Sequence, residues 1–141
     1  MTAALAPVRL SEVLHVARLR GASDVHLCAG ACPAFRVDGV LEAQPTLVAT
    51  EEELSAMAAS LLSSRAMQIL AEKGDATVTR QAQDSGTVRV HAYRTARGTC
   101  LAIRLLAPAV PNLEALHLPA VVATFADKPH GLVIFAGPTG S

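Results

Sequence analysis

Apolar residues recur at helical spacing over residues 8–20, and after residue 22 the pattern changes to an alternation of apolar and polar residues. The helical stretch is followed by Gly21, a residue typical of helix C-caps, so we expect a helix here. In the next stretch, residues 23–27, Val25 and Leu27 alternate with polar residues. This pattern predicts a short strand with one buried face.

A second alternating stretch, residues 34–43, is divided by Asp38 and Gly39. Asp-Gly between two such stretches predicts a β-hairpin, because both central residues of its turn need a positive φ. Thr50, followed by three glutamates, predicts the start of a helix whose first turn it caps. A second short helix up to Lys73 should follow, and then a meander of three strands over residues 75–81, 87–95 and 99–106.

The last part of the chain has a different character, because Pro108 and Pro111 interrupt regular structure. Beyond them we expect two short helices, over residues 113–116 and 120–126, and an apolar strand that begins at Gly131. A nearly continuous apolar strand that runs into a glycine loop is typical of the start of a parallel α/β domain.

The order of these elements predicts an α+β fold with an antiparallel sheet and flanking helices. We expect three segments: a domain over residues 1–108, a linker with short helices over residues 109–130, and the first strand and loop of an α/β domain over residues 131–141.

The composition excludes several classes of function. The 141 residues are 51% hydrophobic and 17% charged, which is enough apolar material for a core. Twelve basic residues balance twelve acidic ones and aromatics make up 3% of the chain, so we expect no nucleic-acid partner. No apolar run reaches the roughly 18 residues of a membrane span and no signal peptide is recognisable, so we expect a cytoplasmic protein.

Three cysteines, Cys28, Cys32 and Cys100, are too unevenly spaced for a disulfide framework. His26 with the first two gives the pattern H-x-C-x3-C, but no second pair of ligands follows at a spacing typical of zinc sites. We therefore predict no metal site and interpret the cysteines as small buried hydrophobic residues.

No enzymatic constellation is recognisable in the sequence. Ser23, Asp24 and His26 alternate along one strand and therefore cannot converge as a hydrolase triad does, so a structural role is expected. An enzyme that uses Cys28 or Cys100 would lack a base at a recognisable spacing.

The chain ends on a loop formed by Gly137, Pro138, Thr139, Gly140 and Ser141. A phosphate-binding loop reads G-x-x-x-x-G-K-[ST], and its backbone N–H groups hold phosphates. Gly-Pro-Thr-Gly is also a common turn composition, but the apolar strand before it favours the nucleotide loop. The lysine and the Mg²⁺-binding hydroxyl would follow the last residue, so we expect half of a nucleotide site.

Six stretches of the sequence occur in the order seen in one family. They are GASDVHL, P-x-F-R-V-D-G, R-V-H-A-Y with a following R-G, A-I-R-L-L, P-x-L-E-A-L-x-L-P and GLVIFAGPTGS. Over residues 10–141 the chain thus resembles the secretion ATPases of type IV pilus and type II secretion systems, in particular the retraction ATPases. The resemblance implies a PAS-like N-terminal domain, a linker and a RecA-like core whose loop reads G-P-T-G-S-G-K-[ST].

The resemblance also implies cofactors and partners. The complete protein would use ATP and Mg²⁺ and form a homo-hexamer. In this hexamer the domain would pack on the ATPase core of the same or a neighbouring subunit. The protein would also contact inner-membrane platform proteins of the pilus. Its location would be cytoplasmic, at the inner membrane when assembled. The residues that position Mg²⁺ and activate water in the family would follow residue 141. We therefore predict no catalytic residue, no bound cofactor and no ATP hydrolysis for this chain alone.

Arginines of the meander are implied by the resemblance to contact nucleotide phosphates. The matching positions are Arg97 in A-R-G and Arg104 in A-I-R-L, with Arg89 and Arg94 as weaker matches. Guanidinium groups suit phosphate oxygens and can stabilise a phosphoryl-transfer transition state. Alternatively, Arg89 and Arg104 face solvent on strands whose apolar residues point inward, and we expect this for the chain by itself.

Two functions remain open at this point. The first is a regulatory and assembly domain of a hexameric ATPase that powers pilus retraction, moving as a rigid body as nucleotide turns over. The second is a free-standing PAS-like sensor that binds a small ligand in its half-barrel. The aliphatic composition supplies an apolar interior for such a ligand but no obvious polar anchors.

Overall fold

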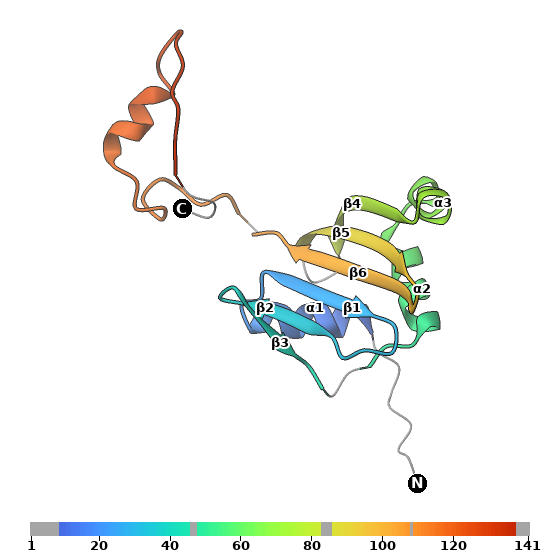
Figure 1. Ribbon diagram of the computed structural model, residues 1–141. Coiled ribbons are helices and arrows are strands. Elements are labelled where there is room, and N and C mark those ends of the chain that lie inside the picture. The colour runs from blue at the N-terminus through green and yellow to red at the C-terminus, as the bar shows by residue number, and fades with distance from the viewer. Residues whose placement is uncertain (1–8, 46–47, 83–85, 108, 138–141) are drawn as a thin grey trace. The chain divides into compact units, whose positions relative to one another are not determined.

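The computed structural model describes residues 9–45, 48–82, 86–107 and 109–137, and it divides into two compact units, Met1–Pro108 and Ala109–Ser141. The first unit is an antiparallel sheet with three helices (Figure 1). Its elements are α1 (Leu10–Leu19), β1 (Asp24–Cys28), β2 (Ala34–Val37), β3 (Val40–Ala43), α2 (Glu51–Leu61), α3 (Ser64–Lys73), β4 (Asp75–Ala82), β5 (Gly86–Thr95) and β6 (Gly98–Leu105).

The six strands form one sheet in the order β3-β2-β1-β6-β5-β4. Two hairpin-linked groups, β1 to β3 and β4 to β6, meet where β1 pairs with β6 over the register Asp24↔Arg104 to Cys28↔Cys100. Every pair of neighbouring strands is antiparallel. The predicted α+β fold with an antiparallel sheet is confirmed.

The helix ends follow the local chemistry that the sequence indicates. Thr50 and Glu53 form a capping box at the start of α2: the Glu53 N–H donates to Thr50 Oγ1 at 3.2 Å, and the Thr50 N–H donates to Glu53 Oε2 at 2.8 Å. Gly74, with φ 86°, ends α3 in a left-handed conformation that other residues rarely adopt. Asp38 and Gly39 both have positive φ (47° and 82°), as the predicted β2–β3 hairpin turn requires.

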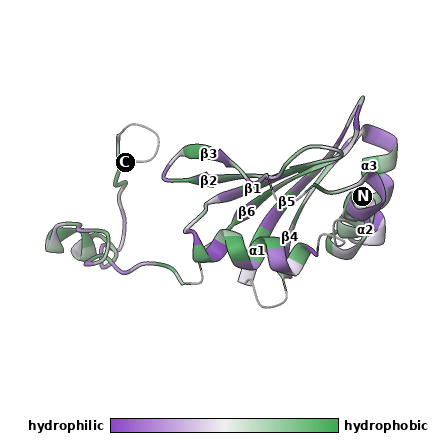
Figure 2. Ribbon diagram, turned by 90° about the horizontal axis from the view of Figure 1, so that it is seen from below, coloured by the Kyte–Doolittle hydropathy of each residue, from purple (hydrophilic) through white to green (hydrophobic). Residues whose placement is uncertain are grey.

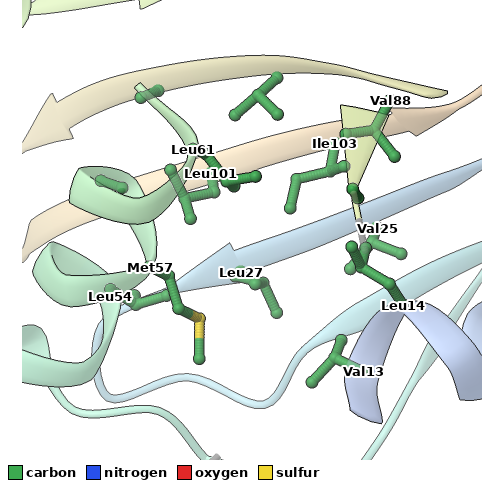
Figure 3. Close-up of a cluster of buried hydrophobic side chains, with 14 of the residues drawn as sticks. Val13, Leu14, Val25, Leu27, Leu54, Met57, Leu61, Val88, Leu101 and Ile103 are labelled. Atoms are coloured by element: carbon green, nitrogen blue, oxygen red, sulfur yellow. The ribbon is translucent and has the colours of Figure 1, made fainter. Parts of the chain in front are cut away.

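The core lies between the sheet and the helices. Figure 3 shows Leu14 of α1 and Leu54 of α2 on the side of the sheet to which Leu27, Leu101 and Ile103 point. All five are at most 1% exposed, and burial of such side chains stabilises the fold by roughly 1.5–3 kcal/mol each. Figure 2 shows α1 along one side of the sheet. The opposite side, which we call the open face, is covered by no helix within the described residues of this unit.

The second unit corrects two predictions. Over residues 113–116 the structure has hydrogen-bonded turns in place of a helix, because His117 leaves the helical conformation with φ 53° and Pro119 follows closely. The other short helix is a 3₁₀ helix, η1 (Ala120–Phe125). Residues 131–137 form no strand, because no other segment in the described part of this unit offers a strand partner. Among the described helices, none is long and apolar enough to cross a membrane.

Candidate functional site: the open face of the sheet

Charged residues gather on the open face in one row across four strands. Alternation places Val25, Val90 and Ile103 in the core, so their neighbours along the strands point the other way. The strand register then aligns Arg36 (β2), Asp24 (β1), Arg104 (β6) and Arg89 (β5) as successive cross-strand partners. We call these four residues the arginine row.

Asp24 is the centre of the arginine row. Its Oδ1 accepts a hydrogen bond from Arg104 Nε at 2.9 Å, and its Oδ2 lies 3.7 Å from Arg36 Nε and accepts from Ser23 Oγ at 2.8 Å. Burial raises the pKa of Asp24, which is 9% exposed, but the bonds from Ser23 and Arg104 and the charge of Arg104 outweigh burial. The net pKa of this carboxyl therefore lies below its usual value, and Asp24 is ionised at neutral pH.

The arginine row carries an excess of positive charge, because it contains three guanidinium groups and one carboxylate, which pairs with Arg36 and Arg104. Among the described residues Arg89 has no carboxylate partner, and it lines a shallow hollow of about 240 Å³ together with Asp24, Arg104 and His91. Thr77 Oγ1 lies 2.9 Å from His91 Nδ1 at the edge of this hollow. Such a surface is suited to anions with several oxygens, which guanidinium groups bind with paired N–H donors.

Arg97 lies far from the arginine row, in the turn between β5 and β6. Arg104 lies seven positions further along the chain, on β6, which corresponds to roughly 23 Å along a strand. The structure therefore does not bring the two predicted phosphate contacts together. The Arg97 N–H donates to Thr95 Oγ1 at 3.2 Å, and Thr95 Oγ1 in turn donates to the Gly98 carbonyl at 3.0 Å, so the turn is internally hydrogen-bonded.

Glu51, the first residue of α2, fixes the β5–β6 turn. Its carboxylate accepts the Thr99 N–H at 2.7 Å and the Thr99 hydroxyl at 2.6 Å, and these bonds lower its pKa. Gly98 has φ 119° and lies so close that a side chain here would overlap the Glu51 carboxylate. The exposed Arg94 lies near the same carboxylate and shares a hollow of about 250 Å³ with it.

Local sequence patterns do not predict the contacts of Glu51 and Arg36. The pattern around Glu51 indicates only a helix start, and the contact of Glu51 with Thr99 spans 48 residues, for which no local pattern exists. Arg36 could have been placed on the open face from the alternation around Phe35 and Val37, but its alignment with Asp24 needs the pairing of β1 and β2.

The other residues considered from the sequence, Ser23, His26 and the three cysteines, do not form a common site. Ser23 Oγ donates to Asp24 Oδ2 at 2.8 Å, and His26 Nε2 is buried without a partner among the described residues. Cys100 is buried and Cys28 half-buried, but Cys32 is exposed, because it lies in the turn after β1, and its predicted burial is wrong. In the described part of the chain, no three His, Cys, Asp or Glu side chains are grouped to hold a metal.

Of the loop residues at the end of the sequence, the structure describes Gly137. Gly137 is exposed and belongs to no helix or strand, and residues 138–141, which are Pro138, Thr139, Gly140 and Ser141, lie outside the described residues. Their assignment to a phosphate-binding loop stays a prediction.

Known proteins resemble the chain over nearly its whole length. No family model matches it. The type IV pilus retraction ATPase PilT of Pseudomonas aeruginosa is 28% identical over 132 residues, which are 94% of this chain and 38% of the relative. A crystal structure of the pilus retraction motor PilT with bound ADP superposes with a TM-score of 0.83 at 30% identity, over 95% of this chain and 39% of that one.

A more distant structure shares the fold alone: the Legionella pneumophila ATPase DotB, with a TM-score of 0.63 at 20% identity over 93% of this chain and 37% of that one. This chain spans less than half the length of each of these proteins. The predicted resemblance is confirmed, and the chain is homologous to the N-terminal region of the PilT-type secretion ATPases.

Proposed function

We propose that the chain is the N-terminal regulatory and assembly domain of a hexameric secretion-type ATPase that powers type IV pilus retraction. The observation that carries this proposal is the match of 95% of the chain to PilT at a TM-score of 0.83. In the proposed protein, residues 1–108 are the PAS-like domain, residues 109–130 the linker and residues 131–141 the start of a RecA-like core. The separation of the two compact units after Pro108 supports this division.

In this proposal the domain packs on the ATPase core of its own or a neighbouring subunit. ATP and Mg²⁺ are cofactors of the complete protein, with Gly137 to Ser141 as the first part of its phosphate-binding loop and Arg97 and Arg104 as phosphate contacts. The complete protein acts in the cytoplasm, at the inner membrane, where it meets the platform proteins of the pilus. The chain alone is proposed to have no ATPase activity.

The contacts of the two arginines suit them to such a role in different ways. Asp24 holds Arg104 through Nε, and the terminal nitrogens of Arg104 have no partner among the described residues, so this side chain is partly ordered before an anion binds and loses less entropy. Arg97 is carried on a turn that Glu51 fixes through Thr99, so its backbone is held while its side chain stays exposed. Both arrangements supply a positively charged side chain on a backbone that is held in place.

Two measurements test the proposal. The coding sequence after Ser141 should continue with G-K-[ST], and a stop codon at that point would contradict the parent ATPase. In the complete protein, Arg97→Ala and Arg104→Ala should each lower the rate of ATP hydrolysis about a hundredfold or more, because arginine contacts to a transferring phosphoryl group have effects of this size or larger. Arg65→Ala, a change of an exposed arginine on α3, is the matched control and should leave the rate unchanged.

The rival function, a small-ligand sensor, gives a different result. Native mass spectrometry of the purified chain should show the mass of the polypeptide alone. A small molecule retained in stoichiometric amount would favour the sensor. Micromolar binding of a fluorescent ATP analogue to the chain alone would contradict the proposal that its nucleotide site is incomplete.

A further inference from the structure

Two of the three cysteines face each other across the seam between β1 and β6. Cys28 and Cys100 are direct cross-strand partners, and both belong to the open face because their neighbours Leu27 and Leu101 are in the core. They come from the two hairpin-linked groups of strands and are 72 residues apart in the sequence. No local sequence pattern brings them together.

The hydrogen bonds of the ladder define the geometry of this pair. On one side the Ala29 N–H donates to the Thr99 carbonyl at 3.3 Å, and at the far end the Leu105 N–H donates to the Ser23 carbonyl at 2.9 Å. Hydrogen-bonded and non-hydrogen-bonded pairs alternate along an antiparallel ladder, so Cys28 and Cys100 form a non-hydrogen-bonded pair. In such pairs the Cα atoms are about 4.5 Å apart, which lies within the range of about 4.4–6.8 Å that a disulfide spans.

The surroundings admit a small reagent to this pair. The two cysteines and Tyr93 line an apolar pocket of about 470 Å³ beside the β5–β6 turn. Burial and the contact with Cys100 raise the pKa of the Cys28 thiol to about 11, and burial beside the thiols raises the pKa of Tyr93 to about 12. The Cys28 thiol is therefore protonated at neutral pH, which makes it slow to react but leaves the spacing of the two sulfurs unchanged.

We propose that Cys28 and Cys100 are a modification site, at which a low-molecular-weight disulfide oxidises the pair to a cross-strand disulfide. The half-buried Cys28 loses its proton, and its thiolate attacks the reagent RSSR, forming a mixed disulfide and releasing RS⁻. Cys100 then loses its proton and attacks the Cys28 sulfur, which forms the protein disulfide and releases the second RS⁻. The two thiols are oxidised by two electrons, the reagent is reduced to two thiols, and the two protons balance the charge.

The test uses the Cys32→Ser variant of the full chain, because the exposed Cys32 would otherwise form its own adducts. The variant is incubated with oxidised glutathione, and its thiols and intact mass are measured. We expect loss of both free thiols, a mass lower by two hydrogens, no retained glutathione, and a tryptic cross-link between the peptides of residues 21–36 and 98–104. The rate should rise about tenfold per pH unit below the thiol pKa, because only the thiolate attacks.

A second variant traps the intermediate. Cys32→Ser/Cys100→Ser should keep one glutathione on Cys28, because the resolving thiol is gone. Cys32→Ser/Cys28→Ser should remain unmodified, because Cys100 is 2% exposed. A stable glutathione adduct on Cys28 while Cys100 is still present, unreacted thiols at pH 10, or a disulfide between two chains would each overturn the proposal. Circular dichroism of each variant confirms that it is folded before it is scored.

Discussion

Gly98 and Glu51 should be energetically coupled, although one lies in the β5–β6 turn and the other starts α2. Gly98 has φ 119°, which an L-residue adopts only with strain, and a Cβ atom added there would overlap Glu51 Oε2. The Glu51 side chain would have to move away. It would then lose both hydrogen bonds from Thr99, whose N–H is buried and has no strand partner on that side among the described residues.

The expected size of the effect has two parts. Backbone strain from a side chain at a positive φ costs roughly 1–2 kcal/mol. The two bonds to the Glu51 carboxylate are charge-assisted, but this carboxylate is largely exposed, so their combined contribution is about 1–2 kcal/mol. Gly98→Ala should therefore lower the free energy of unfolding by about 2–4 kcal/mol in total, which for a domain of this size lowers Tm by about 10–20 °C.

The assay is a double-mutant cycle on the free energy of unfolding, measured by chemical denaturation. Gly39→Ala is the control for backbone strain, because its φ of 82° is also positive while no atom lies near the added Cβ. Glu51→Ala alone should lose about 1–2 kcal/mol. In the Glu51→Ala background, Gly98→Ala should cost no more than Gly39→Ala does, which gives a coupling of about 1–2 kcal/mol.

Additive effects of Gly98→Ala and Glu51→Ala would refute this reasoning. The same holds if Gly98→Ala is no more destabilising than Gly39→Ala in the native background. Either result would mean that the carboxylate of Glu51 does not hold Thr99 and the turn in solution.

Three further predictions concern stability. The pKa of Asp24 is lower in the folded state, so the stability that its ionised carboxylate contributes is complete above the unfolded pKa of about 4 and is lost as the pH falls through the folded pKa. The free energy of unfolding of Asp24→Asn should therefore depend less on pH below about 4 than that of the wild type. Thr50→Ala should lose about 1 kcal/mol in urea denaturation and Thr50→Ser much less, because only the serine keeps the capping hydroxyl. Leu101→Ala should lose about 2–5 kcal/mol in the same assay, whereas Leu19→Ala, at a position 75% exposed, should lose less than about 0.5 kcal/mol.

Features that depend on neighbouring residues could be predicted from the sequence. The capping box at Thr50, the turn at Asp38 and Gly39, and the glycine that ends α3 each rest on chemistry within four residues. The alternation of Val88 and Val90 with Arg89 indicates which side chains are buried, and the structure places them accordingly. Such features need no knowledge of the strand order.

Features that depend on strand order could not be predicted in the same way. The arginine row exists because β1 pairs with both β2 and β6, which brings Arg104 next to a carboxylate 80 residues earlier. The apolar run from Leu132 to Phe135 shows the opposite failure, since its composition predicts a strand but a strand also needs partners that the described part of its unit does not supply. Residue patterns report burial and turns, whereas pairing is decided by the whole sheet.

The positions of the arginines restrict how the proposed nucleotide contacts could be made. A single phosphate group cannot contact both Arg97 and Arg104, because roughly 23 Å of strand lies between them. On the open face the neighbour of Arg104 is Arg89, whose charge is not offset by a carboxylate among the described residues, whereas Asp24 offsets part of the charge of Arg104. An anion at the arginine row would therefore draw most of its electrostatic stabilisation from Arg89, with Arg104 as an oriented donor. Arg97 would serve a separate contact, at the opposite end of β6.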